Sequence, residues 1–72
     1  MTQIKTYRVE LKKVGDLHEV RIYGRMGEVV NNIQPAERLF RQLSSSEEDV
    51  EKWEVHVHDF IQRLVDAGFD EV

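Results

Sequence analysis

The run His56-Val57-His58-Asp59 carries the side chains with the clearest potential for site chemistry. In a chain without cysteine, imidazole and carboxylate groups are the ligands that zinc takes. On a β-strand, His56 and His58 share a face at ligand spacing, and His18 or Asp59 completes the set. On a helix, residues two apart diverge by about 200°, so the two imidazoles cannot chelate one ion. We favour a helix here and therefore assign no metal ligands.

The other motifs predict neither a catalytic centre nor a cofactor site. Ser44, Ser45 and Ser46 form a turn-like run, and the pattern puts no general base beside them. The segment 24–27 lacks both the glycine spacing and the Lys-Ser/Thr ending of a phosphate loop. Paired catalytic carboxylates need a cleft, and a core this small leaves little room for one. We therefore expect a protein that is not an enzyme and binds no cofactor.

Length and composition describe one small domain. A chain of 72 residues buries only about 60% of its unfolded surface. Its 40% apolar and 33% charged residues are typical of a globular domain, and the absence of cysteine excludes disulfides and thiolate chemistry. No apolar run approaches the roughly 18 residues of a membrane span, and residues 1–5 lack the apolar core of a signal peptide. We therefore expect a cytoplasmic protein that does not bind membranes.

Charge is divided unevenly along the chain, whose formal net charge is −4. Residues 1–43 hold eight bases and five acids, which gives +3. Residues 44–72 hold two bases and nine acids, which gives −7. Such a division is typical of two halves that face each other, of solvated faces, or of surfaces that attract a basic or an acidic partner.

Residues 7–12 and 19–23 alternate between apolar and polar side chains, with the period of two that is typical of half-buried strands, and we predict a β-hairpin over 4–24. Gly15 and Asp16 stand at the centre of this pattern and suit a two-residue type II′ or I′ turn. Counting outward from that turn sets the register of a β-hairpin. On one side Leu11 faces Val20 and Val9 faces Ile22; the pairs on the other side are Lys12 with Glu19, Glu10 with Arg21, and Arg8 with Tyr23.

A lone hairpin is unstable in water, so the C-terminal half must cover its apolar side. We interpret residues 25–34 as a connection, in which 28–33 suits a short third strand or an irregular crossing. Pro35 fits the first position of a helix. Apolar residues then recur at helical spacing, and one acid–base pair stands four apart: Ala36, Leu39, Phe40 and Leu43, with Glu37 and Arg41. We predict a first helix over about 35–43.

A second helix is predicted over about 46–67. Ser45 or Ser46 suits its N-cap, with acidic residues in the first turn. Gly68 and Phe69 fit the end of a Schellman motif. Seven apolar residues lie within about 140° on a helical wheel: Val50, Trp53, Val57, Phe60, Ile61, Leu64 and Val65. The alternation over 53–58 also fits a strand, and the fold would then be a hairpin, a helix, a strand and a short helix.

The sequence thus predicts an α+β fold, in which an N-terminal antiparallel β-hairpin packs against a C-terminal helical hairpin. The function it favours is a non-enzymatic module, an adaptor or inhibitor that binds and regulates a larger protein and forms a homodimer. The expected contact residues lie on the hairpin and on the second helix: Arg8, Arg21, Tyr23, Arg25, Glu51, Glu54 and Asp59. The alternative is a nucleic-acid-binding regulator that uses the basic face of the hairpin, against which the isoelectric point of about 5.3 weighs.

Overall fold

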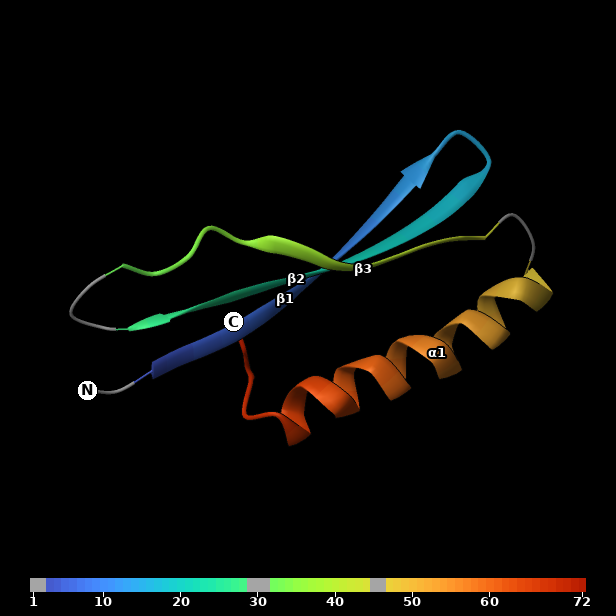
Figure 1. Cartoon of the computed structure of the whole chain (residues 1–72). Helices are drawn as coiled ribbons and strands as arrows, with labels where there is room; N and C mark the ends of the chain where they lie inside the picture. Colours follow the sequence, from blue (N-terminus) through green and yellow to red (C-terminus); the bar gives the residue numbers. More distant parts are fainter. Residues whose placement is uncertain (1–2, 29–31, 45–46) are drawn as a thin grey trace.

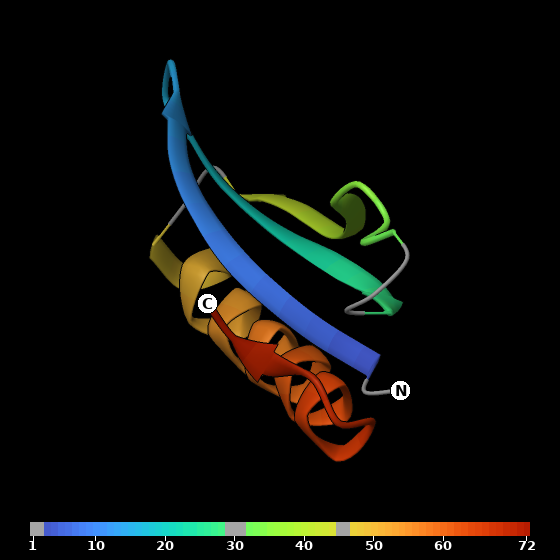
Figure 2. The same cartoon turned by 90° about the vertical axis from the view of Figure 1, so that its left-hand side faces the viewer.

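The protein folds into two layers, a sheet and one helix that lies along one of its faces (Figures 1 and 2). The computed structural model describes residues 3–28, 32–44 and 47–72, with the side chains of 47–50 left aside. Four strands form the sheet in the order β3-β2-β1-β4. Along the chain, the elements are β1 (Gln3–Val14), β2 (Leu17–Glu28), β3 (Glu37–Ser44), α1 (Glu47–Asp66) and β4 (Asp70–Glu71).

Strands β1 and β2 form the predicted hairpin in the predicted register. Leu11 pairs with Val20 and Val9 with Ile22, and the three polar pairs are also as expected. Gly15 has a φ of 61°, and among the described residues no non-glycine residue has a positive φ. This combination selects the type II′ turn over type I′, because type I′ needs positive φ at both central residues. The hairpin runs further than predicted, to Gln3 and Glu28.

The first predicted helix is wrong: residues 37–44 form strand β3, antiparallel to β2. A helix of about nine residues is marginal on its own in water. The backbone N–H and C=O groups along the outer edge of β2 need hydrogen-bond partners. Residues 37–44 supply them by forming a strand beside β2. The helical hairpin is therefore corrected to a sheet with a single helix, while the coarser α+β class is confirmed.

A β-bulge in β3 explains why the apolar residues of this segment have the spacing that is typical of a helix. The register shifts between Ile22 and Tyr23, whose partners are Phe40 and Arg38, so Leu39 is the extra residue. The bulge breaks the period of two, and the apolar residues then recur at three and four. Gly24 makes room for the bulge, because a Cβ there would lie 2.4 Å from Leu39 Cδ1.

The second predicted helix is confirmed as α1, and the alternative strand over 53–58 is wrong. On its apolar side, Leu64 forms a buried cluster with Tyr7 and Ile22 of the sheet, and Phe60 meets Phe40 with ring centroids 5.0 Å apart. Trp53 is also buried, and within the described part of the chain its Nε1–H has no hydrogen-bond partner. Such an unsatisfied donor costs about 1–3 kcal/mol. The proposed serine N-caps lie outside the described residues.

The end of α1 is the predicted Schellman motif, and it leads directly into β4. Phe69 N donates to Leu64 O at 2.9 Å, and Gly68, with φ 93°, donates to Val65 O at 3.0 Å. Strand β4 then runs parallel to β1 beside Thr6 and Tyr7. The suggested strand over 28–33 is represented by one bridge between Gly27 and Ile33, and residues 29–31 lie outside the described residues.

Candidate partner-binding face

The sheet has one face under α1 and one face that no described element covers, which we call the open face. Tyr7, Val9 and Ile22 point toward the helix, since they belong to the core cluster or pack against it. Their neighbours along each strand point the other way, because side chains alternate across a strand. The open face therefore carries the polar half of the hairpin pattern, extended by β3.

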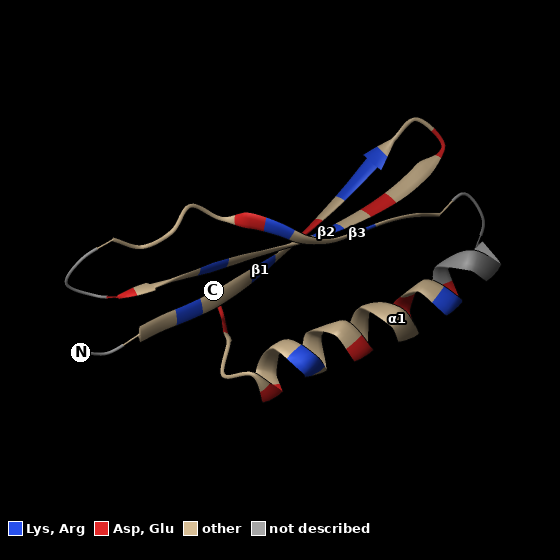
Figure 3. Ribbon diagram, in the orientation of Figure 1, with Lys and Arg blue, Asp and Glu red and all other residues tan. Residues whose placement is uncertain are grey.

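Bases dominate the open face. Across three strands it holds six bases and two acids, a net charge of +4: Arg8, Lys12, Arg21, Arg25, Arg38 and Arg41, with Glu10 and Glu19. Helix α1 carries seven acids and two bases, a net charge of −5. Figure 3 shows the bases and acids of both layers, with most of the blue bands on the strands. The two layers of the molecule therefore have opposite charge.

Glu19 is the central acid of the open face and is only 2% exposed. Its carboxylate accepts hydrogen bonds from Arg21 Nε and, at 3.2 Å, from Arg41. Burial raises the pKa of this carboxyl, but the hydrogen bonds and charges of the two arginines outweigh it and hold the pKa below its usual 4.5. Glu19 therefore joins β2 to β3 as an ionised group and fixes both guanidinium groups in position.

Tyr23 is an aromatic residue on the open face, in contact with two of its arginines. The Arg8 guanidinium lies over its ring, 5.1 Å from the centroid, and Arg21 donates to its hydroxyl at 3.4 Å. A hollow of about 250 Å³ opens beside it, with Arg8 and Arg25 on its lining. This volume is below the roughly 300–1,000 Å³ of small-molecule sites and suits a side chain of a partner.

Two arginines of this face are available for a partner. Glu10 already has ion pairs with Arg8 and Lys12, at 3.2 and 3.9 Å. Within the described residues, by contrast, Arg25 and Arg38 form no ion pair, and both are exposed. Their charge is not used in any ion pair between the described residues.

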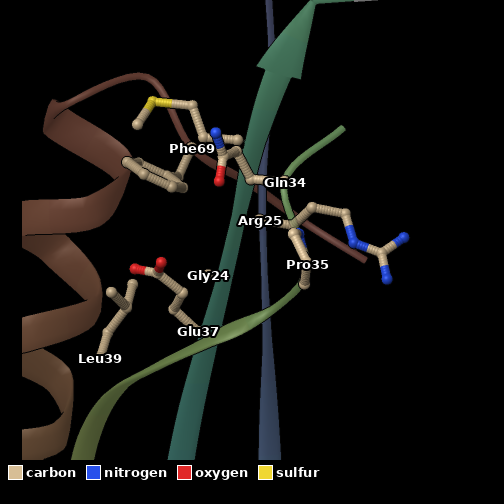
Figure 4. A pocket seen from close by; sticks show the side chains of 8 residues that line it. Gly24, Arg25, Gln34, Pro35, Glu37, Leu39 and Phe69 are labelled. Carbon is tan, nitrogen blue, oxygen red and sulfur yellow. The ribbon is translucent and has the colours of Figure 1, made fainter. Parts of the chain in front are cut away.

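A second hollow, shown in Figure 4, lies at the end of the sheet next to the bulge. It measures about 170 Å³, and Gly24, Leu39 and Phe69 are among the residues that line it. Leu39 and Phe69 lie on the helix side, whereas the Arg25 side chain points away from them (Figure 4). This hollow is too small for a cofactor. The direction of the Arg25 side chain agrees with its place on the open face.

The predicted contact residues fall into two separate groups. The hairpin members, Arg8, Arg21, Tyr23 and Arg25, lie together on the open face. The helix members, Glu51, Glu54 and Asp59, lie in the other layer, so a single flat surface cannot contact both groups. Arg38 and Arg41 were missed because Glu37 and Arg41 were interpreted as a helical pair. No period of two was available as a signal for a strand, because Phe40 and Gln42 share one face and Arg41 and Leu43 the other.

The described histidines do not gather into a metal-binding cluster. His56 and His58 lie on α1, where side chains two residues apart diverge. Among the described residues, no three histidine, aspartate or glutamate side chains gather where they could hold a metal ion.

Comparison with known proteins assigns no relationship. No protein-family model, no curated protein and no solved structure matches the chain. The described part of the chain contains no helix with the length and apolar character needed to cross a membrane. The residues of the open face are therefore the features of this chain from which a function can be inferred.

Proposed function

We propose that this chain is a small non-enzymatic protein that binds and regulates a larger protein, docking its open face on an acidic surface of that partner. The observation that carries the proposal is the gathering of six bases and Tyr23 on a sheet face that no described element covers. The chain as a whole is acidic, with a net charge of −4, so this concentration of bases is not a product of composition.

The residue types on this face are those that supply binding energy between proteins. Tyr and Arg are enriched among interface residues that cost most when truncated. Tyr23 and Arg21 are held in place by contacts within the face, so less side-chain freedom is lost on binding. Arg25 and Arg38 then offer charge to carboxylates of the partner, which sets its orientation and speeds its encounter.

A nucleic acid is the second candidate for the same face. The stacking of Arg8 on Tyr23 supports it, since bases stack on aromatic rings and arginine contacts phosphates. The net charge of −5 on α1 weighs against it, because that layer repels a long phosphate backbone. The acidic protein partner is therefore the better supported of the two.

The test uses capture from a nuclease-treated host extract by three forms of the protein. The test variant combines Arg25→Gln with Arg38→Gln, two exposed bases that form no ion pair with any other described residue. The matched control combines Asp66→Asn with Asp70→Asn, two exposed acids outside the predicted contact residues, and changes the net charge by the same amount in the opposite direction. We expect a protein retained by the wild type and the control to be lost from the test variant by about tenfold or more.

Equal retention by the test variant would contradict the proposal. The nucleic-acid candidate is measured separately, by the anisotropy of labelled single-stranded DNA and RNA at several salt concentrations. Tight binding with a steep salt dependence that is lost in the test variant would replace the protein partner with a nucleic acid.

A further inference from the structure

Strand β1 has an outer edge that is only partly used. On that side β4 pairs with Thr6 and Tyr7 alone. From residue 8 to the turn at Gly15, none of the described strands lies on this side of β1 (Figure 2). The free edge therefore spans residues 8–14, and its midpoint is Leu11.

Backbone groups along this edge point outward at alternate residues. Tyr7 O accepts a hydrogen bond from Val72 N at 2.9 Å, so the polar groups of Tyr7 face the β4 side. By strand alternation, the N–H and C=O groups of Val9, Leu11 and Lys13 face the same side. These groups form a ready template for another strand.

An apolar surface lies at the same edge. Leu11 is 74% exposed, an unusual exposure for a leucine at the middle of a strand. A groove of about 350 Å³ runs between this edge and α1, and its lining includes Val9, Leu11, Trp53 and Val57. An added strand would thus meet both hydrogen-bonding groups and an apolar surface.

We propose that the free edge of β1 pairs with the same edge of a second copy of this chain, antiparallel, about a two-fold axis at Leu11. Leu11 then faces Leu11 of the second copy, and Val9 faces its Lys13, with both pairs exchanging backbone hydrogen bonds. On the open face, Glu10 faces Lys12 of the second copy, and Lys12 faces its Glu10. This register makes the edge complementary to itself in charge, as a two-fold interface requires.

Neighbouring registers are worse for definite reasons. A two-fold axis at Glu10 opposes Glu10 to itself and Arg8 to Lys12, and an axis at Lys12 opposes Lys12 to itself. An axis at Val9 brings the second copy against β4, which already occupies the edge at Thr6 and Tyr7. The register centred on Leu11 is the one that uses the whole free edge without opposing like charges.

Such a dimer has a consequence for the open face. Because the axis stands perpendicular to the sheet, the open faces of both copies lie on one side. Together they form one surface with twelve bases, six from each copy, on a continuous sheet of six long strands. The dimer does not depend on the proposed function, since its edge and its test are separate from the partner.

Sedimentation of the purified chain at about 10–500 µM is the first test, with a mass of twice 8.5 kDa expected at the upper end. Leu11→Lys is expected to weaken dimerisation about tenfold or more. Leu43→Lys is the matched control, an exposed leucine on the other edge strand, and is expected to leave the dimer unchanged. A strictly monomeric wild type, or an equal effect of both variants, would overturn the proposal.

Cysteine cross-linking tests the register, since the chain has no cysteine of its own. In the proposed dimer the two Cα atoms at position 11 lie about 5.5 Å apart, within the range of a disulfide. The two Cα atoms at position 13 lie on the order of 13 Å apart, because four residues separate them along the strands. Mild oxidation is therefore expected to link Leu11→Cys and to leave Lys13→Cys unlinked. Preferential linkage at position 13 would reject this register.

Discussion

The two faces of the sheet differ in what their side chains do. The covered face is apolar where it packs on α1, and Ile22 at its centre is completely buried. The open face is charged, and most of its side chains remain in contact with water. Strand β2 therefore contributes both to the core and to the basic face, because its alternate residues lie on opposite sides of the sheet. Stability and binding can be changed separately, by substituting neighbouring residues.

Glu19 is the exception to this separation. It belongs to the open face, yet it is buried and holds arginines from β2 and β3. A buried carboxylate is costly unless it is paired, and here two guanidinium groups pair it. Glu19 thus contributes to the fold and to the arrangement of the basic face at once.

The largest effect on stability is expected on the covered face. Ile22→Ala should lower the free energy of unfolding by about 3–4 kcal/mol, because it leaves a cavity in a fully packed position. In a domain this small, that loss is a large part of the total. Arg25→Ala, three residues further on and on the open face, should change it by no more than about 0.5 kcal/mol. Urea unfolding of both variants measures the contrast, and equal losses would refute the division between the faces.

A smaller effect, dependent on pH, is expected for Glu19→Gln. At pH 7 the substitution should lower the melting temperature by roughly 5–10 °C, because it weakens the pairing of two arginines. The pKa of Glu19 is lowered in the folded state. The ionised carboxylate therefore makes its full contribution to the stability of the fold at pH values above the unfolded pKa of about 4.5. It is lost as the pH falls through the lower folded pKa.

Thermal melts of the wild type and Glu19→Gln from pH 7 to pH 2 measure that dependence. The two curves should converge in acid, where the wild-type carboxyl is protonated. A difference in melting temperature that persists unchanged at pH 2 would show that the stabilisation does not come from the charge of Glu19.

The hairpin and α1 could be predicted from the sequence because their signals are local. The turn at Gly15 fixes the strand register by counting, and the glycine at position 68 marks the end of the helix. Strand β3 could not be predicted, because its stability comes from pairing with β2 across the chain. The bulge at Leu39 also shifts the apolar residues from a period of two to helical spacing.

The candidate site was predicted in part for the same reason. Arg8, Arg21 and Tyr23 could be assigned to one face once the hairpin register was known. Arg38 and Arg41 join them only through β3, so their contribution depends on a long-range pairing. The strongly basic character of the face, with six bases from three strands, was therefore not visible in the local pattern.

The most direct test of a basic face built from three strands is the backbone NMR of residues 37–44. The structure predicts extended chemical shifts through this segment and cross-strand contacts from Tyr23 to Arg38 and from Glu19 to Leu43. Helical shifts over 37–44, without those contacts, would contradict it. The third strand would then be absent, and the basic face would be reduced to the hairpin alone.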